Sequence, residues 1–206
     1  MATKGFYIGK YEITQAQWKA VMGISVREQV RLVLEAYKQE SKFGFNANSV
    51  ITEDVITNYL AGEGDMYPIY YVNWHEAQEF CNRLSALTGK HYRLPTEEEW
   101  IYAAKGGGYP DNSMINSIDA VEWYKDDNSG IGTHNVGTEQ PNSAGIYDMD
   151  GNLWEWCEDC YDSSCSSRTL RGGSWCINTP FRIYIRTGGD PNRRHYDHGF
   201  RVVLSE

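Results

Sequence analysis

Arginine, tyrosine, histidine and phenylalanine side chains are concentrated near the end of the chain, between residues 176 and 198. This segment reads CINTPFRIYIRTGGDPNRRHYDH and has neither helical nor alternating periodicity. Its residue types suit ligand binding through large contact areas and hydrogen bonds. Two apolar, β-prone runs flank it, Leu170–Trp175 and Phe200–Leu204, and are expected to be the strands that hold it. We therefore interpret residues 176–198 as a ligand-binding loop on a rigid support.

The candidate contact residues in this loop are the large or polar side chains without an evident backbone role. They are Cys176, Ile177, Asn178, Phe181, Tyr184, Thr187, Asp190, Arg193, His195, Tyr196, Asp197 and His198. The residues expected to shape the backbone instead are Pro180, Gly188, Gly189 and Pro191. His195 and His198 could also ligate a metal, but in a loop rich in tyrosine and arginine we interpret them as contact residues.

The loop and its flanks are locally basic within a chain of net charge -9. The arginines concerned are Arg182, Arg186, Arg193, Arg194 and Arg201. This local excess favours an anionic or aromatic ligand, or else a loop that the acidic body neutralises. The overall charge argues against nucleic acid as a partner, because phosphate binding requires a basic surface.

From Cys176 to Ser205 the chain contains no Lys, Glu, Gln, Met or Trp. These are the residue types that cannot be reached by randomising the first two bases of an AAC codon. A segment of strands and turns is also depleted in Lys, Glu and Gln, which is the simpler explanation. The pattern supports diversification of this segment without establishing it.

The chain has five cysteines, which is an odd number: Cys81, Cys157, Cys160, Cys165 and Cys176. Their scattered positions favour free or partly paired thiols over a disulfide framework. Cys157 and Cys160 form a CxxC, but no fourth ligand for zinc is evident, so buried structural thiols are expected there. No run is long and apolar enough to span a membrane, and the first residues contain no signal-peptide core. The oligomeric state is left open, with a monomer plausible.

Helical signals dominate the first half of the chain and disappear after residue 108. A strand is predicted over Phe6–Ile13, and helices begin at the capping residues Thr14, Ser25, Thr52, Asn73 and Thr96. A second strand is predicted over Tyr67–Val72. The helix after Asn73 should bury a stripe that consists of Ala77, Phe80, Cys81, Leu84 and Leu87. Helices followed by short strands and turns indicate an α+β domain.

Several motifs, in order along the chain, resemble the formylglycine-generating-enzyme (sulfatase-modifying factor) domain family. They are IGKYEITQAQW (8–18), RLPTEEEW (93–100), YDMDGNLWEW (147–156), LRGGSW (170–175) and GFRVV (199–203). The resemblance implies a C-type-lectin-like fold in its formylglycine-generating-enzyme variant, with short irregular antiparallel sheets. Residues 1–206 would form one such domain, and residues 24–67, longer than usual for the family, would be a mostly helical insertion.

Some members of this family are copper oxidases that convert a substrate cysteine to formylglycine. In those, two cysteines after the GGS-aromatic motif bind the metal, and thiolates suit a soft cuprous ion. Here the two positions fall on Ile177 and Arg182, or, one residue earlier, on Cys176 and Phe181. Either alignment leaves at most one thiolate. The oxidase interpretation is therefore disfavoured, and the chain is expected not to be an enzyme.

The chain is most similar to the C-type-lectin-fold variable proteins of diversity-generating retroelements. In those proteins the residues between RGGSW and GFRVV are diversified to create ligand-binding surfaces. The resemblance implies a receptor or adhesin-like protein that binds an unknown protein or surface ligand, surface-displayed or associated with a virion. A lectin of fixed specificity is a weaker alternative.

The family also implies a possible structural calcium ion, with no cofactor otherwise required. The matching positions are Asp148, Gly151, Leu153 and Glu155, which would offer side-chain and backbone oxygens. The simpler interpretation is that Asp150–Gly151 forms a turn and that Glu155 pairs with a neighbouring arginine.

Overall fold

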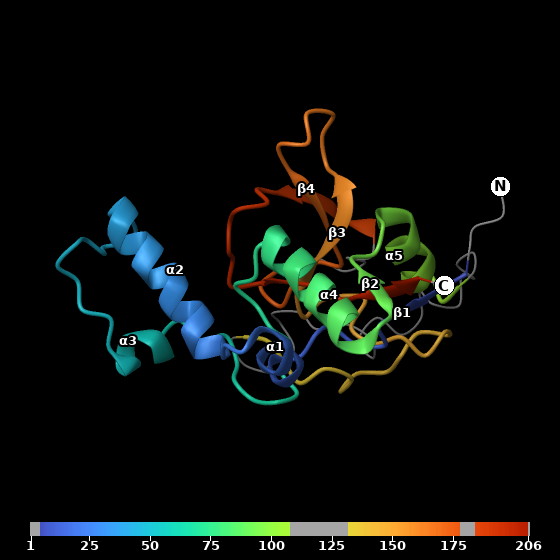
Figure 1. The fold of residues 1–206 in the computed structure, drawn as a ribbon, viewed down its shortest axis with the longest axis horizontal. Helices are drawn as coiled ribbons and strands as arrows, with labels where there is room; N and C mark the ends of the chain where they lie inside the picture. The colour runs from blue at the N-terminus through green and yellow to red at the C-terminus, as the bar shows by residue number, and fades with distance from the viewer. Residues whose placement is uncertain (1–4, 108–131, 178–183, 206) are drawn as a thin grey trace.

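The computed structural model describes residues 5–107, 132–177 and 184–205, and within them the predicted α+β class is confirmed. Its helices are α1 (Gln15–Met22), α2 (Val26–Glu40), α3 (Glu53–Thr57), α4 (Trp74–Thr88) and α5 (Glu97–Ala104). The strands are β1 (Phe6–Ile8), β2 (His91–Arg93), β3 (Trp154–Cys160), β4 (Arg168–Arg171), β5 (Arg186–Gly189), β6 (His198–Gly199) and β7 (Val203–Ser205). Figure 1 shows α2 and α3 at one end of the molecule and the strands around α4 and α5 at the other.

The helices begin where the sequence predicts them, because each start is fixed by local hydrogen bonds. Reciprocal capping boxes open α1, α2, α4 and α5, and the Thr52 hydroxyl caps α3. Helix α4 ends at Gly89, whose φ of 68° lies in the left-handed region that glycine adopts without strain. Three acidic residues in the first turn of α5 complement the helix dipole, as the sequence indicates.

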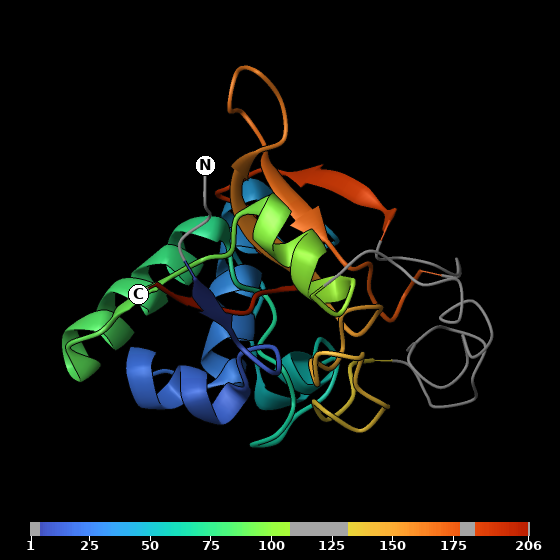
Figure 2. The ribbon, with the colours of Figure 1, turned by 90° about the vertical axis from the view of Figure 1, so that its right-hand side faces the viewer.

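Two small sheets combine strands from both halves of the chain (Figure 2). In the first, β7 pairs antiparallel with β1 and β2, so that both ends of the chain meet. In the second, the order is β5-β4-β3-β6, with β6 parallel to β3. This parallel pair departs from the antiparallel sheets that were expected. Since β5 and β6 both run in the direction of β3, the chain between them must cross back over the sheet.

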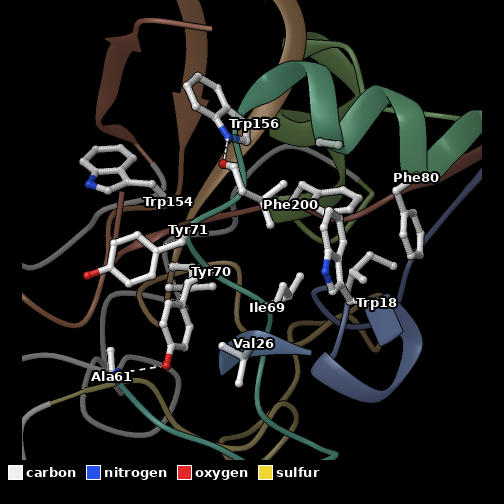
Figure 3. Packing of buried hydrophobic residues seen from close by; sticks show 14 of the residues in the cluster. Trp18, Val26, Ala61, Ile69, Tyr70, Tyr71, Phe80, Trp154, Trp156 and Phe200 are labelled. Atoms are coloured by element: carbon white, nitrogen blue, oxygen red, sulfur yellow. Dashed lines mark hydrogen bonds between the residues drawn. The ribbon is translucent and has the colours of Figure 1, made fainter. Parts of the chain in front are cut away.

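The core is rich in aromatic side chains from elements that are far apart in the sequence (Figure 3). The rings of Trp18 and Phe80 are stacked at 5.8 Å between centroids, and Phe200 meets both edge-on. Buried Trp156 donates its indole N–H to the carbonyl oxygen of Val72 at 2.9 Å. The predicted stripe on α4 is correct except at its C-terminal end, where Leu87, in the last turn, is 69% exposed.

The predicted strand over Tyr67–Val72 is wrong, although its residues Ile69 to Val72 are buried in the core. Only one bridge forms there, between Thr14 and Pro68. Proline lacks the N–H that a strand ladder uses, and Tyr71 has a φ of 57°, which ends any extended conformation. The Tyr71 N–H instead donates to the carbonyl oxygen of His195, so this segment supports the candidate loop.

The helices α2 and α3 lie within residues 24–67, the region predicted to be an insertion. Helix α2 buries the face that includes Val26, Val30 and Val33. Its buried Gln29 donates to the Tyr71 carbonyl at 2.8 Å and to the Glu76 carboxylate at 3.1 Å. The helical region is thereby joined to the start of α4. None of the helices among the described residues is long and apolar enough to cross a membrane.

Candidate functional site

The candidate segment follows an irregular path that side chains and backbone outside it hold in place. After β5, residues 190–197 cross the sheet and enter β6 beside β3. The carbonyl oxygens of Pro191 and His195 accept hydrogen bonds from the N–H groups of Trp74 and Tyr71. The Asp197 carbonyl accepts one from Trp154. The two expected supporting strands are present only in part, because β4 ends at Arg171 instead of Trp175 and β7 begins at Val203 instead of Phe200. Strand β5 is an additional strand inside the segment.

The predicted contact residues differ in their exposure. Tyr184, Asp190, Arg193 and Tyr196 are exposed, and Thr187, His195, His198, Cys176 and Ile177 are half-buried, with Ile177 packed against the core. Asp197 is buried, at 3% exposure. Asn178 and Phe181 lie outside the described residues. The exposed set forms the part of the segment that a ligand can reach.

Most of the local basic charge is neutralised within the protein. Arg201 is fully buried against Glu155, Arg194 pairs with Glu76, and Arg186 pairs with Glu97. Arg182 lies outside the described residues. The Arg193 guanidinium is exposed and makes no ion pair with another described residue. Of the two sequence interpretations, neutralisation by the acidic body is therefore correct for Arg186, Arg194 and Arg201.

The Asp197 carboxylate is the centre of a hydrogen-bond network that joins the two ends of the segment. It accepts from the Ser174 hydroxyl at 2.8 Å and from the Cys176 thiol at 3.1 Å. The Nδ1 atom of His195 contacts its other oxygen, and Nε2 of His198 lies 3.6 Å from that oxygen. The sequence did not indicate this role for Asp197, since Cys176 and Asp197 are separated by 21 positions.

The protonation states in this network follow from burial and from the partners. Burial lowers the pKa of His198 to about 4, which outweighs the opposing effect of Asp197, so its imidazole is neutral near pH 7. Burial disfavours the charged form of Asp197, but the hydrogen bond from His195 and the nearby imidazoles lower its pKa to about 2. Burial and the Asp197 charge raise the pKa of the Cys176 thiol. Cys176 contacts a carboxylate rather than an imidazole base, so the arrangement does not activate a nucleophile.

A groove of about 300 Å³ separates the segment from the helical region. One side is formed by α2 and the turn after it, where Tyr37 and Phe43 have ring centroids 4.7 Å apart. Asp190, Arg193 and Arg194 line the other side. The residues from α2 were not predicted to belong to the site, because about 150 positions separate them from the segment and no local pattern connects the two.

Of the four possible calcium ligands, Glu155 has both carboxylate oxygens committed. They accept from the Arg201 guanidinium, at 2.6 and 2.7 Å, and one also accepts from the Trp100 indole at 2.7 Å. Glu155 therefore pairs with an arginine, as the simpler interpretation expected. Asp148 accepts from the Gly137 N–H, and its other oxygen is buried with no hydrogen-bond partner among the described residues. Calcium takes six to eight oxygens, so an ion here would have to use that Asp148 oxygen and backbone carbonyls. Calcium binding stays a prediction.

Glu12 is buried beside the same residues and accepts from the Asn152 side chain and the Leu153 N–H. Burial, and then the charges of Asp148 and Glu155, raise its pKa well above the ordinary value of 4.5. A raised carboxyl pKa stabilises the fold below the unfolded-state value, and this stability is lost as the pH rises through the folded-state value. We expect Glu12→Gln, which does not titrate, to gain stability relative to the unmodified protein as the pH rises above 4.5.

Urea unfolding of both proteins from pH 4.5 to pH 8 measures this difference, with Glu98→Gln on the exposed side of α5 as the control. The expectation would be wrong if the free energies of unfolding of the Glu12 variant and the unmodified protein differed by the same amount at every pH in this range.

Cys160 and Cys165 form a disulfide, whereas Cys81, Cys157 and Cys176 are free. The expectation of buried thiols in the CxxC is therefore correct for Cys157 and wrong for Cys160. The turn after β3 brings Cys165 back against Cys160, with 4.8 Å between their Cα atoms. The partly paired set that the odd number of cysteines indicated is confirmed.

Comparison with known proteins agrees with this architecture. The profile of the sulfatase-modifying factor enzyme 1-like domain family matches residues 1–206. Chaperone protein LppX of Paenibacillus barcinonensis is 29% identical over 98% of this chain and 80% of its own length. The inactive C-alpha-formylglycine-generating enzyme 2 of Bos taurus is 34% identical over 66% of this chain, which spans about half of that relative's length.

Among solved structures, variable protein 1 of Treponema denticola is similar to this chain throughout its length. The two share 28% identity and a TM-score of 0.71, and the match covers 98% of this chain and 84% of the other. The C-type-lectin-like fold in its formylglycine-generating-enzyme variant, expected from the sequence motifs, is confirmed. So is the resemblance to variable proteins.

Proposed function

Because the chain belongs to the sulfatase-modifying factor enzyme 1-like domain family, we propose that it is a ligand-binding member of that family and not an enzyme. In this proposal it is a variable protein of a diversity-generating retroelement. Residues 176–198 are its diversified segment, and the ligand is a protein or another surface molecule. The similarity to a variable protein and to an inactive formylglycine-generating enzyme supports this assignment.

The observation that carries the proposal is the contrast between the segment's backbone and its exposed side chains. The backbone is fixed by Tyr71, Trp74 and Trp154, all outside the segment. Tyr184 and Arg193 project from it and are exposed. Tyrosine and arginine supply much of the binding energy at protein interfaces, and exposed positions tolerate substitution. A surface of this kind can change its specificity without losing its fold.

The oxidase alternative lacks a metal-binding pair of thiols. The sequence from 177 to 198 contains no cysteine, and the Cys176 thiol is hydrogen-bonded to Asp197. Incubation with copper and a cysteine-containing peptide, followed by mass spectrometry of the peptide, tests this alternative directly. Turnover to formylglycine would overturn the proposed function.

Sequencing of sibling copies of the gene tests the proposal itself. Substitutions should be confined to codons 176–198, and a reverse transcriptase gene and a template repeat should lie nearby. Within the segment, diversified codons should share their third base. Siblings that are uniform in this segment, or that vary equally elsewhere, would contradict diversification.

Neighbouring Arg193 and Arg194 provide a matched test of which positions can vary. Arg193 is exposed, whereas Arg194 makes two hydrogen bonds to the Glu76 carboxylate, at 2.7 and 3.0 Å. We expect Arg193→Ala to change the free energy of unfolding by less than about 0.5 kcal/mol. Arg194→Ala should cost roughly 1–2 kcal/mol, since its partly exposed pair is screened by solvent. Urea unfolding measures the free energy of unfolding of each variant. Equal losses of stability in the two variants would show that the segment is not divided into anchoring and free positions.

We also propose that the protein is displayed at a cell or virion surface. The disulfide between Cys160 and Cys165 supports this, because disulfides persist in oxidising compartments. Alkylation of thiols in protein recovered from its native host, with and without prior reduction, tests the proposal. Two thiols that become reactive only after reduction are expected, and five reactive thiols without reduction would contradict it.

A further inference from the structure

Four metal-ligating side chains converge where the two ends of the candidate segment meet. Cys176 comes from its start, and His195, Asp197 and His198 come from its end. The ligand atoms of the last three all lie within 4.8 Å of one another. The thiol of Cys176 is 3.1 Å from the Asp197 carboxylate, on the oxygen opposite the histidines. Asp197 thus lies between the thiol on one side and the two imidazoles on the other.

The composition of this cluster matches that of a tetrahedral transition-metal site. A thiolate, two imidazoles and a carboxylate are the ligand types that bind zinc. With bonds of about 2.0–2.3 Å, the ligand atoms of a tetrahedral site lie roughly 3.3–3.7 Å apart. Cys176 and His198 already lie 3.1 and 3.6 Å from the Asp197 oxygens. Among His195, Asp197 and His198 the widest separation is 4.8 Å, which has to close by about 1 Å. The Cys176 thiol lies outside that group and has to rotate toward it from the opposite Asp197 oxygen.

The surroundings of the cluster also suit an ion. Asp197 is held by the Ser174 hydroxyl, which belongs to the GGSW motif and lies outside the segment. Nε2 of His198 faces the Asp197 carboxylate, and its other ring nitrogen, Nδ1, is buried with no hydrogen-bond partner among the described residues. His195 is partly exposed, with 31% of its side chain accessible, which leaves a path for the ion to enter. The Ser174 hydrogen bond orients the Asp197 carboxylate, as the outer hydrogen-bond shell of a metal site orients its ligands.

We propose that Cys176, His195, Asp197 and His198 bind one zinc-class divalent metal ion, which fastens the two ends of the segment together. Binding releases the proton of the Cys176 thiol to solvent and involves no redox change. Because the site exists only in the folded protein, the ion binds the folded state in preference to the unfolded chain and thereby stabilises the loop that presents Tyr196 and Arg193.

All four ligands fall at positions predicted to vary, so the site is a property of this sequence and not of the family's fold. Sibling proteins that carry other residues there would not bind the metal. The site does not depend on the proposed function, because an ion can bind whether or not the surface recognises a ligand.

Cobalt(II) is the probe for this site, because its spectrum reports geometry and ligands. Protein freed of metal with a chelator, with the Cys160–Cys165 disulfide intact and Cys176 free, should bind one Co²⁺ per chain. The complex should show the intense visible bands of tetrahedral coordination and a thiolate-to-cobalt charge-transfer band. Zinc should displace the cobalt and raise the midpoint of thermal unfolding. Cys176→Ser should remove the charge-transfer band, and His198→Asn should weaken binding by at least about 100-fold.

His91→Asn, an exposed histidine on β2, is the matched control and should bind cobalt as the unmodified protein does. Thermal unfolding of each metal-free variant shows separately whether it is folded. Failure of the folded, unmodified protein to bind cobalt would overturn the proposal and leave the cluster as a hydrogen-bonded anchor. A cobalt spectrum unaffected by Cys176→Ser would overturn it as well. Neither result bears on sibling diversity, which tests the proposed function.

Discussion

Replacing Arg201 with methionine is expected to lower the free energy of unfolding by about 3–5 kcal/mol. Arg201 and Glu155 are both fully buried and joined by two hydrogen bonds. The guanidinium also donates to the carbonyl oxygens of Gly9 and Tyr147, so it joins the first strand to the loop before β3. Without it, the Glu155 carboxylate is left in the core with one remaining donor, the Trp100 indole. Urea unfolding followed by tryptophan fluorescence measures the loss.

Two further variants distinguish the effect of the buried charge from the effect of removing any arginine. Arg83→Met removes an exposed pair with Glu79 on α4 and should cost less than about 0.5 kcal/mol. The double variant Arg201→Met with Glu155→Gln should recover part of the loss, because no uncompensated charge then remains in the core. A double variant less stable than Arg201→Met alone would show that the cost comes from packing and not from the buried carboxylate.

Gly189→Ala is expected to destabilise the protein by about 1–3 kcal/mol, because it would crowd a well-packed core. A Cβ at this position would lie 2.5 Å from the Trp156 ring and 2.9 Å from the Leu170 side chain. Trp156 is fully buried, and its indole hydrogen bond to Val72 prevents the ring from moving aside. Strand β5 approaches the core this closely only because residue 189 has no side chain.

The adjacent Gly188 is the matched control for this prediction. A Cβ there would lie 2.4 Å from the ring of Tyr161, which is 40% exposed and is covered by Arg186 and not by the core. Gly188→Ala should therefore lower the free energy of unfolding by less than Gly189→Ala does. Measured free energies of unfolding that are equal for the two variants would contradict the distinction. If they differ as expected, sibling proteins should vary at residue 188 and keep glycine at residue 189.

The same contrast between anchoring and exposed positions limits the proposed variable surface to fewer residues than the sequence alone suggested. The segment was predicted from its composition, in which anchoring and free residues are not distinguishable. Asp197 is an anchor, and Arg194 and Gly189 are positions where the fold itself constrains the side chain. A binding surface built from Tyr184, Arg193 and Tyr196 would be smaller than the predicted set of contact residues. Helix α2 would compensate by providing a second wall across the groove.

Features that depend on neighbouring residues could be predicted from the order of the amino acids. Helix starts are fixed by hydrogen bonds three residues apart, so Thr14, Asn73 and Thr96 could be identified from their capping partners. The family motifs determined the fold, and the missing second cysteine after GGSW disfavoured the oxidase. Strand bounds were less predictable, because a short strand is stabilised by its partners across the sheet and not by its own residues.

The contacts between distant side chains could be identified only in the folded chain. Arg201 looked like part of a basic surface, and it is instead the buried partner of Glu155, 46 positions away. Asp197 looked like a contact residue, and it joins Cys176 to two histidines. Such contacts depend on the path of the chain across the sheet between β5 and β6, and no local sequence pattern predicts that path. Periodicity and capping act over a few residues, whereas burial and charge pairing are set by the path of the whole chain.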